Sequence, residues 1–335
     1  MDQNTNISGP AGELQLSIII PVYNRAGLIK HTLNSLDPAH HPGVTFEVIV
    51  VDDGSDDDTW TVIERQYPHV RLFRNEKKGA AAARNLGLAK ANGKYIMYLD
   101  SDDLVGENYF LKKIALLEAD PEYLACYGEY EVFRSDGAFS PGQVIFSHKY
   151  PLLDGYRNGR EHLTNFLAGN FTPPHTIIWQ RRFLVKIKGH DELLAINQDV
   201  ELFIRAIFKG LRITAVHDDT RVYVRQHNVD SRVGDPKNNT VKWRQILELR
   251  KKIFAELRVY AYDEAECYEA MGGYLFSYWK LLRHTEPALA TAYLNFAKEV
   301  YWPVSVKGGV GFRLMAALLG PVKAVELKYY LLKRD

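Results

Sequence analysis

The chain is predicted to be an α/β protein with a mostly parallel central sheet flanked by helices, followed by a C-terminal helical region. Two observations predict this fold. Between residues 16 and 99, short apolar runs typical of strands alternate with segments of helical periodicity, as in sheets built from crossover connections. From about residue 238 onward, apolar residues recur at helical spacing, which predicts a series of amphipathic helices.

The first part of the chain supplies the expected parallel strands. Residues 16–21 form an Ile-rich run that is apolar on both faces, as is typical of parallel strands between two helical layers, and Pro21 ends it. Further strands are expected at residues 46–51, 70–73 and 95–99. The helices between them are expected at residues 26–36, at 57–67 and at 79–91.

The regular alternation of predicted strands and helices ends after residue 105. The sequence then predicts a helix at 107–119, a strand at 124–133, a turn at 135–137 and a returning strand at 144–146. Residues 147–176 are expected to be irregular, before a strand at 176–179, a helix at 197–209 and short strands at 211–216 and 220–225. Asp199 falls in the first turn of the helix at 197–209, where the helix dipole favours an anion.

Composition narrows the class of protein. With 42 Lys and Arg against 41 Asp and Glu, the formal charge of +1 gives no overall attraction to nucleic acid. The two cysteines, Cys126 and Cys267, form no CxxC pair and no metal-ligand spacing, which favours a reducing compartment. The N-terminus lacks the features of a signal peptide, and no run reaches the ~20 apolar residues of a membrane-spanning helix. A cytoplasmic protein is therefore expected.

Carboxylates gather where the strand expected at 95–99 ends. Asp100, Asp102 and Asp103 follow this strand directly, with Ser101 among them. Oxygen ligands suit Mg²⁺ or Mn²⁺, and Mg²⁺ shares its remaining positions with water and substrate phosphates. Two interpretations stay open here. One is a metal–diphosphate site, and the other is a solvated acidic turn or an N-cap of the helix that follows.

Two other polar clusters occupy equivalent positions. Residues 21–25 and 52–55 follow the first and second expected strands. In an open parallel sheet, ligands bind beyond the carboxyl ends of the strands, at the switch point of strand order. All three clusters are therefore expected to converge on one crevice. His175 and His190 are expected to be structural or surface residues.

The segments SIIIPVYNR, VIVVDDGSDDDT and NEKKGAAAARNLGLAKANGKYIMYLDSDD closely resemble the signature of glycosyltransferase family 2, whose members have the Rossmann-like GT-A fold. The resemblance covers residues 15–105 and continues more loosely through KGHDELLAINQDVELFIRA. In that later stretch, His190 stands in place of the family's Phe, and Gln198 stands in place of the Glu that precedes Asp199.

The resemblance implies a division of the chain into a flexible N-terminus at 1–14, a GT-A catalytic domain at 15–235 and a helical region at 236–335. Within the catalytic domain, residues 15–105 would bind the nucleotide sugar and 106–235 the acceptor. The final helices mix basic and apolar residues. They are either packing elements or lie on an anionic surface, so peripheral contact with the inner face of the cytoplasmic membrane is one expectation.

On the donor side, the resemblance assigns the nucleotide sugar to Pro21, Tyr23, Asp53, Arg84, Asp100, Ser101 and Asp102. Pro21 and Tyr23 would flank the base and ribose, and Asp53 would accept a hydrogen bond from the ring N–H of the base. Arg84 would contact the base or a phosphate.

Asp102 resembles the last residue of the family's DXD motif, which would bind Mn²⁺ or Mg²⁺, while Asp103 would keep the capping role. His227 would reach the metal or the leaving phosphates. On the acceptor side, Asp199 would be the base that deprotonates the acceptor hydroxyl. Asp191 and Glu192 would either orient the acceptor or form a solvated edge.

The implied activity is metal-dependent, inverting transfer of a sugar from a nucleotide diphosphate to a hydroxyl of a saccharide or lipid-linked acceptor, in cell-envelope or capsular polysaccharide synthesis. UDP is the favoured nucleotide, because an acid facing a pyrimidine N–H suits uracil. The alternative is a catalytically inactive sugar-nucleotide-binding or scaffold protein of polysaccharide assembly, which the presence of both Asp102 and Asp199 disfavours. A dinucleotide-dependent oxidoreductase would need GxGxxG after the first strand, where the chain has PVYNRAG. The sequence carries no signal for an oligomeric state.

Overall fold

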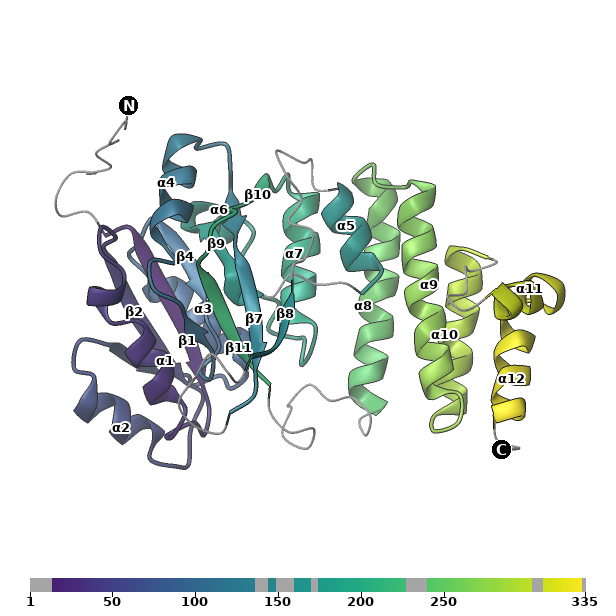
Figure 1. Cartoon of the computed structure of the whole chain (residues 1–335), viewed down its shortest axis with the longest axis horizontal. Helices are drawn as coiled ribbons and strands as arrows, with labels where there is room; N and C mark the ends of the chain where they lie inside the picture. The colour runs from purple at the N-terminus through teal and green to yellow at the C-terminus, as the bar shows by residue number, and fades with distance from the viewer. Residues whose placement is uncertain are drawn as a thin grey trace. The chain divides into compact units, whose positions relative to one another are not determined.

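The computed structural model describes residues 14–135, 144–148, 160–169, 174–226, 240–302 and 310–332 (Figure 1). Their helices and strands form two compact units. The first unit contains every strand of the described residues, together with helices that precede residue 160 or lie between residues 181 and 208. The second unit is helical.

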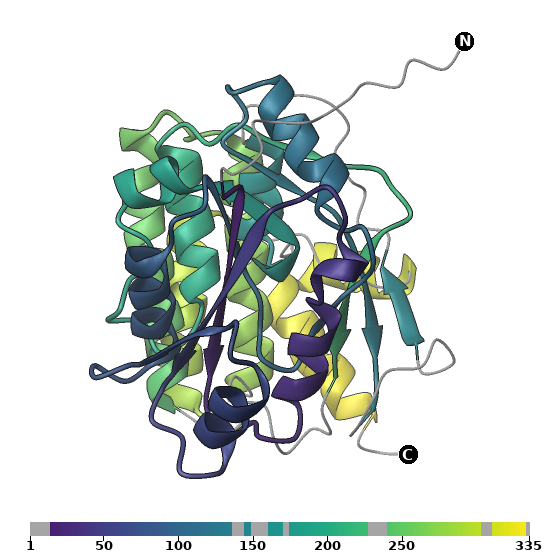
Figure 2. The ribbon, with the colours of Figure 1, turned by 90° about the vertical axis from the view of Figure 1, so that its left-hand side faces the viewer.

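A seven-stranded sheet is the centre of the first unit (Figures 1 and 2). Its strands are β1 (Leu16–Val22), β2 (Phe46–Asp52), β3 (Arg71–Arg74), β4 (Tyr95–Tyr98), β6 (Ala125–Tyr127), β9 (Ile177–Gln180) and β10 (Ile213–Ala215). They lie in the order β10-β6-β9-β4-β1-β2-β3, and neighbours are parallel except where β9 pairs with β4 and β6. The predicted α/β fold with a mostly parallel central sheet is confirmed.

Helices flank this sheet. They are α1 (Ile29–Ser35), α2 (Thr59–Gln66), α3 (Ala80–Lys90), α4 (Leu111–Ala119), α6 (Arg181–Lys186) and α7 (Gln198–Phe208). The strand β1 illustrates why a central strand is apolar throughout. Ile18 and Ile20 belong to the core that also contains residues of α1 and α4, whereas Ile19 contacts α3.

The helix predicted at 107–119 begins only at Leu111. Leu104–Val105 form the short strand β5 instead, and the backbone of Asn108 has a φ of +58°, which a continuous helix does not allow. The helix α6 was not predicted at all.

A second sheet has the order β5-β11-β7-β8, in which β7 spans Glu129–Phe133, β8 Val144–His148 and β11 Arg221–Arg225. The prediction of a single strand at 124–133 was wrong, because the chain leaves the first sheet after β6 and enters the second at β7. Gly128 lies at this change of sheet, and a Cβ there would come within 2.4 Å of Cε of Lys113. Most of the turn predicted at 135–137 lies outside the described residues.

Gly87 lies where α3 comes closest to β1. A Cβ on Gly87 would lie 2.3 Å from Cγ2 of Ile19, whereas a Cβ on the helical Gly273 of the second unit would meet no atom within 4 Å. We expect Gly87→Ala to lower the free energy of unfolding by about 1–3 kcal/mol, because overpacking outweighs the better helix propensity of Ala. Gly273→Ala is the matched control and should raise stability by up to about 1 kcal/mol. Urea denaturation measures both, and equal effects would contradict this account of α3.

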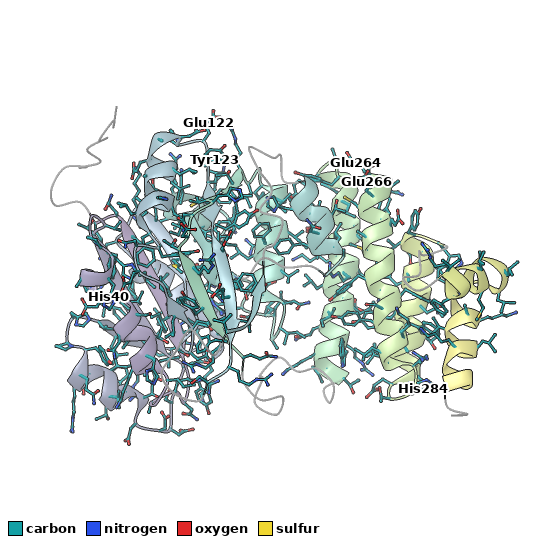
Figure 3. The ribbon with its side chains drawn as sticks, in the orientation of Figure 1. His40, Glu122, Tyr123, Glu264, Glu266 and His284 are labelled. Atoms are coloured by element: carbon teal, nitrogen blue, oxygen red, sulfur yellow. The ribbon has the colours of Figure 1, made fainter. Side chains whose placement is uncertain are left out.

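The second unit consists of α5 (Arg160–Leu167), α8 (Thr240–Val259), α9 (Ala265–Leu282), α10 (Pro287–Val300), α11 (Val310–Leu319) and α12 (Pro321–Leu332). The predicted C-terminal helical region is therefore confirmed. Figure 3 marks the two ends of α9, with Glu264 and Glu266 at its start and His284 beyond its last turn. Acidic side chains at a helix N-terminus interact favourably with the helix dipole.

The helix α5 differs from the predictions, because the sequence placed it in an irregular stretch of the acceptor half. It groups instead with the C-terminal helices. The fully buried Arg250 of α8 explains this grouping, since both terminal nitrogens of its guanidinium donate to the carbonyl of Phe166 at 3.2 Å. The same guanidinium lies 4.1 Å from the ring centre of Tyr274 in α9. Among the described helices, none is long and apolar enough to cross a bilayer.

Candidate active site

Polar side chains gather along the edge where the parallel neighbours β4, β1 and β2 end. Pro21 lies near the end of β1, and Tyr23 follows it with 49% of its surface exposed. Arg25 of the same turn pairs with Asp102 beyond β4, with 3.5 Å between Nε and Oδ2. Asp53 follows β2 and donates its backbone N–H to the last carbonyl of β1 at 2.8 Å. The clusters that the sequence places at three strand ends are thus neighbours in space.

The carboxylate of Asp53 is held by the segment that leads into α3. The backbone N–H of Gly79 donates to both of its oxygens at 2.7 and 2.8 Å, and Asn75 Nδ2 donates to Oδ1 at 2.6 Å. Asp52 is fully buried and accepts from the backbone N–H of Ser55 at 3.1 Å. Asp52 therefore stabilises a turn, whereas Asp53 is a partly exposed carboxylate in a fixed position.

Arg84 of α3 joins the two sides of the site. Its buried guanidinium donates to Oδ1 of Asp100 at 2.9 Å and to Oε1 of Gln198 at 3.2 Å. Asp100 follows β4, whereas Gln198 is the first residue of α7. A single buried cation therefore connects the carboxylates after β4 to the helix that carries Asp199.

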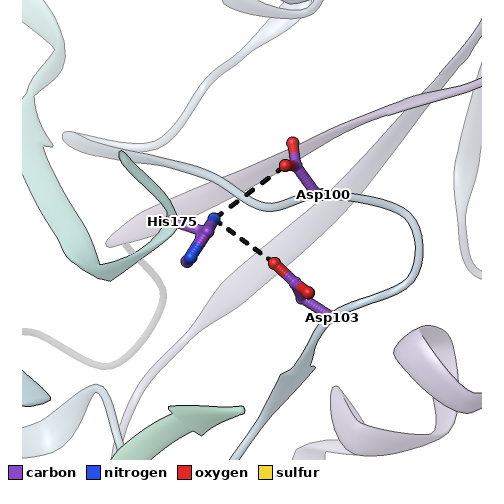
Figure 4. Close-up of side chains that lie close together, drawn as sticks. All are labelled: Asp100, Asp103 and His175. Carbon is purple, nitrogen blue, oxygen red and sulfur yellow. Dashed lines mark ion pairs between the residues drawn. The ribbon is translucent and has the colours of Figure 1, made fainter. Parts of the chain in front are cut away.

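His175 lies between two of the carboxylates that follow β4 (Figure 4). Its Nδ1 is 3.3 Å from Oδ2 of Asp103 and 3.9 Å from Oδ2 of Asp100. His175 is buried, and neither of its ring nitrogens makes a hydrogen bond to another described residue. Burial, and then the charges of Asp102 and Asp100, raise the pKa of Asp103 well above its usual value. Bringing these carboxylates together is unfavourable unless a proton or a cation offsets their charge.

The capping role predicted for Asp103 was wrong. The next helix begins eight residues later at Leu111, and Asp103 instead accepts from the backbone N–H of Arg225 in β11 at 2.8 Å. This hydrogen bond attaches the turn after β4 to the second sheet. Ser101, in the same turn, is buried.

The donor set at this edge fits a divalent cation. Ligand atoms of Asp100, Asp103 and His175 all lie within 4.8 Å of one another. Carboxylate oxygens suit Mg²⁺ and Mn²⁺, and imidazole is a common ligand of transition metals. Asp102, the ligand implied by the DXD resemblance, pairs with Arg25 next to this group. His227 lies outside the described residues.

Asp199 lies in the first turn of α7, and its Oδ1 is 3.1 Å from Nε2 of His190. Burial acts to raise the pKa of Asp199, but the charge of Arg84 and the hydrogen bond from His190 outweigh it and hold the pKa below its usual value. About a third of the side chain, 34%, is still exposed. Asp199 is therefore an ionised, accessible carboxylate at neutral pH, as a general base has to be.

Asp191 and Glu192, the two residues expected on the acceptor side, stabilise the loop before α7. Asp191 accepts from the backbone N–H of Leu193 at 3.0 Å. Glu192 accepts from Nδ2 of Asn85 at 3.0 Å and pairs with Lys77 at 3.2 Å. These contacts fasten the loop to itself and to the α3 side of the site.

The sequence predicted His175 and His190 to be structural or surface residues, and it did not predict their contacts with carboxylates. Both side chains are buried and adjacent to carboxylates. The only local signal was the presence of His190 where the resembling family has Phe, and that signal does not name Asp199 as its partner. The contacts became visible only when the strands and α7 were placed together.

The fold and site define an α/β protein that gathers carboxylates and a buried cation at the carboxyl edge of a parallel sheet. The family model described as Glycosyl transferase family 2 matches residues 17–183, and the chain belongs to this family.

Relatives support the same assignment. An uncharacterized glycosyltransferase of Rickettsia bellii is 33% identical over 129 residues, which cover 38% of this chain and 18% of the relative. The UDP-Glc:alpha-D-GlcNAc-diphosphoundecaprenol beta-1,3-glucosyltransferase WfgD of Escherichia coli is 34% identical over 140 residues, which cover 40% of this chain and 54% of WfgD. The chain therefore matches only part of the length of these relatives.

Solved structures share the fold. The crystal structure of Staphylococcus aureus TarS 1-349 in complex with UDP has a TM-score of 0.62 at 21% identity, and the match covers 95% of this chain and 91% of that one. The complex of the same TarS segment with UDP-GlcNAc has a TM-score of 0.61 at 22% identity, with coverage of 85% and 81%. The GT-A fold expected from the resemblance is confirmed.

Proposed function

We propose that this chain is a metal-dependent, inverting glycosyltransferase that moves a sugar from a nucleotide diphosphate, with UDP favoured, to a hydroxyl of a saccharide or lipid-linked acceptor. One observation carries the proposal. Arg84 pairs with Asp100 on the donor side and lowers, together with His190, the pKa of Asp199 on the acceptor side. A leaving-group site and an ionised base therefore face the same buried guanidinium.

Asp199 takes the proton from the acceptor hydroxyl, whose own pKa lies far above neutrality, as the oxygen attacks the anomeric carbon. The bond from that carbon to the diphosphate breaks on the opposite side, so a single displacement inverts the configuration. Asp53 and Tyr23 hold the nucleotide at the ends of β2 and β1. A cation bound by Asp100, Asp102, Asp103 and His175 would supply Lewis-acid neutralisation of the diphosphate charge.

The names of related proteins support the choice of substrates. TarS has been crystallised with UDP and with UDP-GlcNAc, and the name of WfgD specifies UDP-Glc and alpha-D-GlcNAc-diphosphoundecaprenol. From these substrates we infer a UDP-sugar donor for this chain and a role in cell-envelope polysaccharide synthesis.

The exposed Leu314 and Leu318 of α11, next to Arg313, suit peripheral contact with a membrane that carries a lipid-linked acceptor. Co-sedimentation of the full chain with anionic vesicles tests that contact.

Calorimetric titration with UDP tests the donor site. We expect Mn²⁺ to raise the affinity for UDP at least tenfold, which corresponds to about 1.4 kcal/mol. His175→Ala should remove most of this gain, because it deletes a nitrogen from the proposed ligand set. His69→Ala is the control, since the exposed His69 lies beyond α2, and it should leave the gain unchanged.

Two outcomes would overturn parts of the proposal. An equal affinity for UDP with and without Mn²⁺ would contradict the proposed metal dependence. Tight binding of NAD(H) in place of UDP would contradict the proposed transferase activity. A screen of UDP-sugars for UDP release, with saccharide and lipid-linked acceptors, then separates an enzyme from the catalytically inactive sugar-nucleotide-binding alternative.

A further inference from the structure

The contact between His190 and Asp199 lies outside the roles assigned so far. The imidazole of His190 is fully buried, with 0% of its side chain exposed, and its Nε2 is 3.1 Å from Oδ1 of Asp199. Among the described residues, Oδ1 is the only carboxylate oxygen of Asp199 that receives a hydrogen bond, so Oδ2 is left for another partner.

The surroundings determine the tautomer of His190. An ionised carboxylate only accepts hydrogen bonds, so the proton between the two groups belongs to Nε2. Nδ1 is buried and makes no hydrogen bond to any described residue. A second proton on Nδ1 would create a buried charge with an unsatisfied donor, which is costly. Burial accordingly lowers the pKa of His190, although the contact with Asp199 opposes this.

The backbone of His190 is held as firmly as its ring. Asn85 of α3 accepts from the His190 N–H at 2.8 Å and donates to the His190 carbonyl at 2.9 Å. The preceding Gly189 has a φ of +58°, and a Cβ there would lie 2.3 Å from Oδ1 of Asn85. The ring itself packs edge-on against Tyr98 of β4, with 4.8 Å between ring centres. These contacts hold the imidazole so that its Nε2–H points to Oδ1 of Asp199.

We infer that His190 is a positioning residue: its Nε2–H fixes Oδ1 of Asp199 so that Oδ2 points to the acceptor hydroxyl. This inference rests on the proposed function, because it takes Asp199 to be the base. According to this inference, Asn85 and Arg84, which are adjacent residues of α3, both act on Asp199. Arg84 sets the charge of the base, and Asn85 sets its orientation through His190.

Two substitutions separate positioning from packing. His190→Phe keeps the ring against Tyr98 and removes the donor, whereas His190→Gln keeps a donor nitrogen that can reach the place of Nε2. We expect His190→Phe to lower kcat on the order of 10- to 100-fold, because small misplacements of a reacting group have effects of this size. The donor KM should stay within about twofold, and His190→Gln should recover most of kcat. His41→Phe is the matched control, since His41 is a buried histidine that bonds the carbonyl of Ser35 away from the site.

A measurement without turnover accompanies the kinetics. In protein labelled with ¹⁵N-histidine, the signals lost in His190→Gln identify His190 by nuclear magnetic resonance. We expect a neutral ring protonated at Nε2, and Asp199→Ala should shift that proton signal. A ring protonated at Nδ1, or a charged ring, would overturn the inference.

The outcomes distinguish this inference from the proposed function. If Asp199→Asn is inactive while His190→Phe keeps the wild-type kcat, the positioning role is wrong and the base assignment stands. If His190→Phe and His190→Gln lose equal activity, His190 is only a packing residue. If Asp199→Asn keeps its turnover, the base assignment of the proposed function fails, whatever His190 does.

Discussion

Asp199→Asn is expected to lower kcat on the order of 10²- to 10⁴-fold, the contribution typical of a positioned general base. The amide has nearly the same shape as the carboxylate but cannot take the proton of the acceptor hydroxyl. Affinity for UDP should change less than about twofold, because Asp199 lies on α7 rather than among the strand ends of the proposed nucleotide site. Steady-state kinetics and UDP calorimetry on the same preparation measure both quantities.

Asp120→Asn is a suitable control for the change of charge. Asp120 follows α4 and accepts from the backbone N–H of Glu122 at 3.0 Å, a hydrogen bond that Asn also accepts. Its replacement should leave kcat unaltered. Near-normal turnover in Asp199→Asn would show that another group removes the proton.

Lys113→Met is expected to lower the free energy of unfolding by about 3–5 kcal/mol, because it leaves a buried carboxylate without its cation. Lys113 of α4 is fully buried, and its Nζ donates to Asp218 and to Thr220, each at 3.0 Å. Burial lowers the pKa of Lys113, and Asp218 opposes this shift. The pair attaches α4 to the segment that leads into β11, and β11 holds Asp103 through the backbone of Arg225. Urea denaturation measures the loss.

Two further variants test whether the unpaired charge causes that loss. Lys113→Met combined with Asp218→Asn should recover much of the stability, because Asn still accepts from the backbone of Thr220 and carries no charge. Lys94→Met breaks the ion pair with Glu118, in which both partners are partly exposed, and should change stability by no more than about 1 kcal/mol. A loss in Lys113→Met as small as that of Lys94→Met would contradict the buried-charge explanation.

Helices and strands that depend only on neighbouring residues were predicted from the sequence, whereas those that depend on residues far along the chain were missed. The strands β1, β2 and β4 were predicted to within about two residues because an apolar run between two helical layers has a local signature. The break at Gly128 was missed because residues 124–133 were predicted as one strand. The change of sheet between β6 and β7 depends on strand pairing with distant parts of the chain. The helix α5 was missed because its partners are residues of α8 and α9, far along the chain.

For the candidate site, too, local features were predicted from the sequence and long-range contacts were not. The sequence by itself determined that polar clusters follow three strands, two of them with carboxylates, and that Asp199 lies in the first turn of a helix, because strand ends and helix starts are local features. Only the tertiary structure decided which side chains meet. Arg84 and Gln198 are 114 residues apart, and His175 reaches Asp103 from a separate loop. Contacts of this kind depend on the order of strands and on burial, which no local pattern encodes. They place Asp103, which the sequence predicted to cap a helix, next to His175 in the proposed metal site.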